Sequence, residues 1–209
     1  MTGRPLIKLP QLPGRAESEI FFDALTTNSA DAVAAGTAED LLEPFSAALA
    51  AALAARRDEL VTEGQLLPGA SEALAAVAKL DGVVQSVLTG NSKANAELKL
   101  RAFGLDEHLD FGIGGYGSDP YPKGTLLRVA REQAARKYPE MTFTEHGTVY
   151  IADSSRDVDA ARIGGARSLA VASGRASAAE LRDAGADAVL PDLADPAALT
   201  ALIIQLTQS

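Results

Sequence analysis

The sequence predicts an α/β fold, with a parallel sheet between two layers of helices and a small helical module ahead of it. From Leu67-Pro68-Gly69 onward, short apolar runs alternate with helical segments, which is typical of a parallel sheet covered on both faces. Before that point the apolar residues recur at helical spacing, and no strand is indicated. With 209 residues, 47% of them apolar, the chain is long enough to bury such a core.

The first third of the chain is predicted to be helical. Residues 1–11 hold two prolines and are interpreted as an extended lead-in. A helical module follows at 12–66, with one helix over 16–25 and a long helix from about 44 to 61. The apolar stripe of the long helix is formed by Phe45, Leu49, Leu53 and Leu60.

The α/β core is predicted at 67–209, where the periodicity alternates between that of helices and that of strands. The predicted strands span 84–88, 111–113, 148–152, 168–172 and 188–190. The predicted helices span 71–80, 92–103, 123–137, a segment that ends at the Gly164-Gly165 pair, 178–183 and 196–206.

A β-α-β unit between Gly147 and Gly174 is the organising element of this core. Its first strand ends at Asp153, and Asp157 follows near the start of the next helix. Ligands bind outside the carboxyl ends of parallel strands, and two carboxylates there suit Mg²⁺, which needs only one or two besides water and phosphate oxygens. The alternative is that Asp153 caps the helix and Asp157 is a solvated acid in its first turn. Taken alone, the Asp153 and Asp157 positions favour this second interpretation, a helix cap and a solvated acid, over a metal site.

A second candidate site lies at the turn after the strand 84–88. Thr89, Gly90 and Asn91 stand between this strand and a helix, where backbone N–H groups and the Thr89 hydroxyl can bind an anion. An ordinary turn capped by Asn91 or Ser92 explains the same residues equally well. Lys123 begins another helix, where a cation opposes the helix dipole, so it is either a phosphate-binding lysine or a surface residue.

The segment 112–117 spells G-x-G-x-x-G, the fingerprint of dinucleotide binding. A helix should begin directly behind the third glycine, but Ser118-Asp-Pro-Tyr-Pro follows. We therefore predict that this segment is a loop without a cofactor.

Composition restricts the class of partner. A net charge of −9 without a basic run argues against nucleic acid and anionic membranes, but not against a phosphorylated small molecule. The chain has no cysteine, which excludes disulfides and thiol catalysis. Without a signal peptide or an apolar run of membrane-spanning length, we expect a cytoplasmic protein. The oligomeric state stays open.

In order and placement, these motifs resemble the last three of four motifs in the haloacid dehalogenase-like hydrolases. The matching stretches are Leu88-Thr89-Gly90-Asn91, then Lys123, then Ile151-Ala152-Asp153 with Asp157. The region from 148 to 174 is similar to the phosphoglycolate phosphatase-like branch, and 12–66 resembles the helical cap of that branch. The resemblance implies a Rossmann-like core, with Thr89, Gly90, Asn91 and Lys123 on the phosphoryl group and Asp153 and Asp157 on Mg²⁺. One small departure is Ala152, where the family usually has glycine.

A larger departure concerns the first motif of the family. Its members open with an apolar strand that ends in D-x-D-G-T and supplies the nucleophilic aspartate. The nearest match here, 20–27, has Asp23 but Leu25 in place of the second acid. We interpret Asp23 as a helix residue, the alternative being a degenerate nucleophile.

The missing strand would lie between 84–88 and 148–152 in the family. Its loss opens a gap of ~10 Å and leaves two rows of backbone groups unpaired. The two strands must then close together, recruit a segment such as 1–10, or borrow a strand from a partner. We expect an N-terminally shortened family member, and an intact protein from its source that begins at Met1 would contradict this.

The resemblance thus implies a Mg²⁺-dependent phosphomonoesterase for a small phosphorylated metabolite, inactive as written because the nucleophile of the family is missing. The alternative is a pseudoenzyme or binding protein that retains the phosphate and Mg²⁺ pockets. Loss of a nucleophile can cost ~10⁶ in rate.

Overall fold

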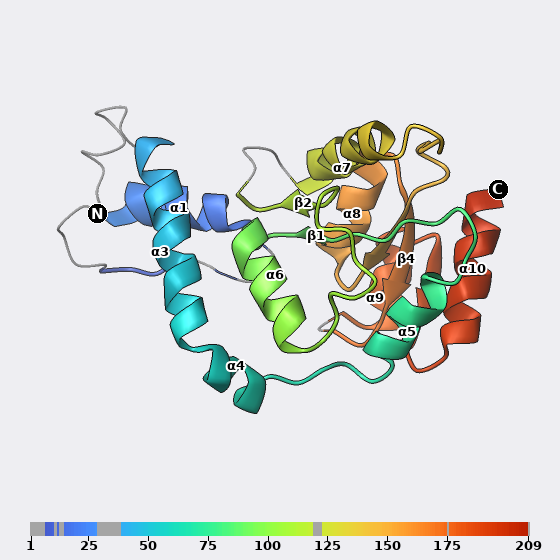
Figure 1. Cartoon of the computed structure of the whole chain (residues 1–209), viewed down its shortest axis with the longest axis horizontal. Helices are drawn as coiled ribbons and strands as arrows, with labels where there is room; N and C mark the ends of the chain where they lie inside the picture. Colours follow the sequence, from blue (N-terminus) through green and yellow to red (C-terminus); the bar gives the residue numbers. More distant parts are fainter. Residues whose placement is uncertain are drawn as a thin grey trace.

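The computed structural model describes residues 7–10, 12, 15–28, 39–118, 123–174 and 176–208, and of Lys123 only the backbone. Its larger sheet has three parallel strands in the order β3 (Val149–Ala152), β4 (Arg167–Val171) and β5 (Ala188–Leu190) (Figure 1). These are the predicted strands to within one residue. The prediction of an α/β fold with parallel strands is confirmed.

Helices cover both faces of this sheet, because successive residues of a parallel strand point to opposite sides. Leu169 of β4 packs with α5 (Ala70–Val77) and α10 (Pro196–Gln208) on one face. Its neighbour Ala170 packs with α8 (Ser155–Ile163) and α9 (Ala178–Asp183) on the other. Both residues have no exposed surface, so β4 is the centre of the core.

A second, separate sheet holds two parallel strands, β1 (Leu88–Thr89) and β2 (Gly115–Tyr116). The predicted strand at 111–113 is therefore wrong, and the predicted loop at 112–117 contains a strand. β2 contains glycine at position 115 because a side chain would not fit there. A Cβ on Gly115 would lie 2.6 Å from Leu88 Cδ1 and 2.8 Å from Leu126 Cβ. Leu126 belongs to α7 (Lys123–Lys137), which packs against both strands.

The described residues before 67 form helices and no strand: α1 (Glu17–Asn28), the short 3₁₀ helix η1 (Glu39–Leu41), α3 (Leu42–Ala55) and α4 (Arg57–Glu63). Phe21 and Phe45 join α1 to α3, with ring centroids 4.8 Å apart. The predicted continuous helix at 44–61 is wrong, since it breaks at Arg56. There the N–H of Arg56 bonds the Leu53 carbonyl, a tighter i to i+3 bond that ends α3.

Two further predictions concern this region. Asp23 lies in α1, as expected, and its carboxylate pairs with Arg15. Of the predicted lead-in 1–11, only residues 7–10 are described. In the described parts of the chain, no helix has the length and apolar character needed to cross a membrane.

Asp110 anchors the turn that leads into β2, and we expect its contribution to stability to depend on pH. It accepts hydrogen bonds from Lys137 Nζ (2.7 Å), Tyr138 Oη (2.7 Å) and the N–H of Gly112 (2.8 Å). Burial raises the pKa of Asp110, but the bonds from Lys137, Tyr138 and Gly112 outweigh it, and the net pKa is lowered. An aspartate whose pKa is lower in the folded than in the unfolded state stabilises the folded protein at pH values above its unfolded-state pKa, about 3.9. That stabilisation is lost as the pH falls through the folded-state pKa.

Asp110→Asn should therefore lower the free energy of unfolding by about 1–3 kcal/mol at pH 7 and by much less at pH 2.5. Urea denaturation at both pH values measures this difference. Asp159→Asn is the control, because its pair with Arg162 at 2.8 Å is exposed, and such pairs contribute about 0.5 kcal/mol. An equal loss for Asp110→Asn at both pH values would contradict the ionic explanation.

Candidate active site

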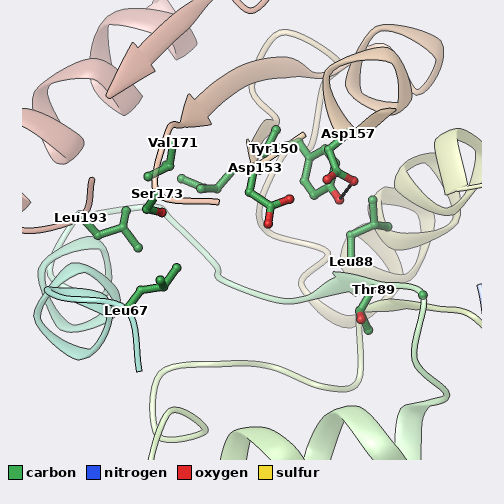
Figure 2. Close-up of a pocket in the computed structure, with 12 residues that line it drawn as sticks. Leu67, Leu88, Thr89, Tyr150, Asp153, Asp157, Val171, Ser173 and Leu193 are labelled. Carbon is green, nitrogen blue, oxygen red and sulfur yellow. Dashed lines mark hydrogen bonds between the residues drawn. The ribbon is translucent and has the colours of Figure 1, made fainter. Parts of the chain in front are cut away.

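A pocket opens between the carboxyl ends of β1 and β3 (Figure 2). Thr89 and Gly90 line it from the end of β1, and Asp153 lines it from the end of β3. This is the location expected for a ligand site of parallel strands. The remaining lining residues include Leu67, Leu88, Tyr150, Ile151, Asp157, Ser173 and Leu193.

Asp153 and Asp157 hold two different positions at this pocket. The Asp153 side chain projects into the open space between the strands (Figure 2). Asp157 is 5% exposed, and its two carboxylate oxygens accept hydrogen bonds from Tyr150 Oη (3.0 Å) and Ser154 Oγ (2.6 Å). Ser154 is also the N-cap of α8, since its side chain accepts the N–H of Asp157. Asp157 is thus a buried, hydrogen-bonded carboxylate rather than a solvated acid.

Tyr150 is a residue of this site that the sequence reasoning missed. Burial, followed by the charge and hydrogen bond of Asp157 and the charge of Asp153, raises the pKa of Tyr150 far above its ordinary value. The phenol therefore stays protonated and donates to Asp157. A signal was present in the sequence: Tyr150 carries the one hydroxyl inside the run Val149-Tyr-Ile-Ala152, and a buried tyrosine hydroxyl needs a partner.

Thr89 is oriented by a short chain of polar contacts. Its Oγ1 accepts hydrogen bonds from the side chain (2.8 Å) and the backbone N–H (3.2 Å) of Asn91. Lys99 Nζ in turn lies 2.6 Å from Asn91 Oδ1, which sets the direction of the amide. Because Oγ1 already accepts two bonds, the Thr89 hydrogen remains for a ligand in the pocket. Lys99, from α6 (Lys93–Ala102), had no signal in the sequence.

The structure brings four of the six predicted site residues to one pocket: Thr89, Gly90, Asp153 and Asp157. Asn91 donates a hydrogen bond to Thr89 but does not line the pocket. Lys123 begins α7 as predicted, but its side chain lies outside the described part of the chain.

The oxygen donors fit a hard divalent cation. A carboxylate has about four lone-pair positions, so the bonds from Tyr150 and Ser154 leave Asp157 able to accept more. Asp153 offers a second carboxylate on the open side, and Mg²⁺ needs only one or two of them together with water. Asp153 and Asp157 are therefore the pocket residues that could hold a divalent cation.

The parallel strands, the carboxylates at their carboxyl ends and the hydroxyl opposite define an α/β protein with a polar pocket at the strand ends. The family model described as haloacid dehalogenase-like hydrolase matches residues 3–162, which is more than half of the chain. The protein belongs to the haloacid dehalogenase-like hydrolase family. The match begins within the lead-in and includes the whole helical module. No curated protein matches the chain.

Proposed function

We propose that the pocket binds the phosphoryl group of a small phosphomonoester together with Mg²⁺, as in the phosphoglycolate phosphatase-like branch of the family. One observation carries the proposal: a hydroxyl held ready to donate, Thr89, and two carboxylates, Asp153 and Asp157, line the same pocket. A phosphoryl oxygen needs such a donor, and a bound cation would neutralise its charge.

The role of each residue follows from its chemistry. Thr89 and the backbone of Gly90 would contact the phosphoryl oxygens, while Asn91 holds the Thr89 hydroxyl in place. Lys123 would add a compensating charge, as the family resemblance implies. Asp153 would bind Mg²⁺ from the open side, and Asp157, oriented by its own hydrogen bonds, from the buried side.

We further propose that turnover is slow compared with a family member that has the nucleophilic aspartate in its pocket. Among the described residues that line the pocket, the carboxylates are Asp153 and Asp157, and both are assigned to the cation. Phosphoryl transfer through an aspartyl-phosphate needs another carboxylate aimed at phosphorus. The protein would therefore bind phosphate and Mg²⁺ without efficient hydrolysis.

Isothermal titration calorimetry with inorganic phosphate and MgCl₂ tests the binding. We expect phosphate to bind in the presence of Mg²⁺, and Asp153→Asn to weaken that binding at least about 10-fold, because it removes the open carboxylate ligand. Asp159→Asn is the matched control, an exposed aspartate on the helix that follows Asp153, and should bind as the unchanged protein does.

A parallel assay with p-nitrophenyl phosphate tests the turnover. Absence of phosphate binding, or binding that Asp153→Asn leaves unchanged, would contradict the proposed site. Fast Mg²⁺-dependent hydrolysis that Asp153→Asn abolishes would support the site but contradict the slow turnover.

A further inference from the structure

A group of buried polar atoms lies where the start of α1 meets the start of α6. The N–H of Glu17 donates to the Gly90 carbonyl at 2.7 Å, which joins the first turn of α1 to the turn after β1. The Glu17 side chain reaches the first turn of α6, where Asn95 Nδ2 donates to its Oε1 at 2.9 Å. Asn95 is only 2% exposed, so this contact belongs to the interior of the protein.

Three oxygen atoms of this group are buried without a hydrogen-bond partner. They are Glu17 Oε2, Ser92 Oγ and Asn95 Oδ1. Ser92 is 4% exposed and precedes Asn95 by three residues, so both side chains lie on one side of the first turn of α6. A buried polar atom without a partner lowers stability, because it has lost its bonds to water and gained none in return. The three atoms together therefore indicate a site for a polar ligand.

The three atoms cannot satisfy one another completely. The Glu17 carboxylate only accepts hydrogen bonds, so the Asn95 amide must turn its NH₂ group towards it. Asn95 Oδ1 is then a second pure acceptor, on the other side of the amide. The Ser92 hydroxyl has one hydrogen and can serve only one of the two acceptors. At least one of them needs a donor or a cation from outside the group.

The charge of Glu17 favours a cation over a neutral ligand. In the part of the chain that the structure describes, no lysine or arginine pairs with this carboxylate: Arg15 pairs with Asp23 instead, and Lys93 Nζ lies over the Tyr116 ring, 5.8 Å from its centroid. The N-terminus of α1 stabilises a negative charge at this position. A water molecule would donate to the two acceptors but would leave the buried charge without a positive partner, which is unfavourable.

We propose that Glu17, Ser92 and Asn95 bind a monovalent cation, K⁺ or NH₄⁺. One carboxylate and two neutral oxygens balance a single positive charge, whereas a divalent ion would leave an excess charge buried. The bound cation joins the helical module to α6, so its binding stabilises the folded protein. None of the three residues lines the pocket that contains Asp153 and Asp157, and the proposal does not depend on phosphate binding there.

Differential scanning calorimetry in the chloride salts of K⁺, NH₄⁺ and tetramethylammonium tests this site, without Mg²⁺ or phosphate in the buffer. Tetramethylammonium has no N–H group and is too bulky to reach buried oxygens, and equal concentrations of about 100 mM keep the screening of surface charges constant. We expect a Tm at least about 3 °C higher in KCl or NH₄Cl than in tetramethylammonium chloride. The salt with the higher Tm identifies the preferred cation.

Two variants locate the cation. Glu17→Gln removes the charge at nearly constant size and should reduce the difference in Tm to less than about 1 °C. Its matched control is Glu19→Gln, which removes an acid from the same first turn of α1 but one that is 48% exposed, and the difference should persist. Ser92→Ala removes one oxygen without changing the charge, and should raise the KCl or NH₄Cl concentration for half-maximal stabilisation at least about threefold.

Two results overturn the proposal. One is an equal Tm of the unchanged protein in all three salts, which assigns the three oxygens to water. The other is a difference in Tm that Glu17→Gln and Ser92→Ala both retain in full, which places the cation elsewhere on the protein. Because phosphate and Mg²⁺ are absent throughout, failure of the phosphate site leaves this measurement unaffected.

Discussion

Leu169→Ala is expected to lower the free energy of unfolding by about 3–5 kcal/mol. Leu169 has no exposed surface and lies at the middle of β4, between β3 and β5. Its side chain contacts both helices of one face, α5 and α10. Alanine would leave a cavity bordered by a sheet and two helices, which are poorly able to collapse into it. Urea denaturation followed by far-UV circular dichroism measures the change.

Ile204→Ala is the control for this substitution. It removes a side chain of similar size from α10, but one that is already 41% exposed, so we expect a loss of about 1 kcal/mol or less. Similar losses for the two variants would show that β4 is not the centre of the core.

The sequence predicted the part of the fold that local patterns specify. The strands β3, β4 and β5 are apolar runs, and Gly164-Gly165 marks the end of α8, so periodicity and turn residues agree there. β2 was missed because it consists of Gly115 and Tyr116, and glycine has no strand propensity of its own. Only the close approach of β1 and α7 selects those residues, and that packing is not visible in the sequence.

The candidate site likewise contains residues that the sequence indicates and one, Lys99, that it does not. Asp153, Asp157 and Thr89 could be found because each lies at the carboxyl end of a strand or within a few residues of it, where ligands of parallel strands bind. Lys99 could not be found, since it reaches Asn91 from the second turn of α6. Such a contact depends on the angle between a helix and the turn before it. That angle cannot be predicted from the residue types of the helix and the turn.

Gly117→Ala is expected to lower the free energy of unfolding by about 3 kcal/mol and to weaken phosphate binding. A Cβ at Gly117 would overlap the Gly90 carbonyl and lie 3.0 Å from the N–H nitrogen of Glu17. The same glycine donates to the Asn91 carbonyl (2.8 Å) and accepts the N–H of Ser18 (3.1 Å). These neighbours are backbone atoms, so none can move aside by changing a rotamer.

The contacts of Gly117 also hold Gly90 and Asn91 beside the candidate site. Displacing Gly90 and Asn91 moves the Asn91 side chain and N–H that position Thr89, so a loss of stability and a loss of phosphate affinity should appear together. Gly82→Ala is the matched control: Gly82 has a φ of +71° and no neighbour within 4 Å, so alanine there costs only the left-handed conformation, about 1 kcal/mol. Denaturation and calorimetry on both variants measure the two effects. If Gly117→Ala costs no more than Gly82→Ala and binds phosphate as the unchanged protein does, the junction of α1, β1 and β2 does not support the site.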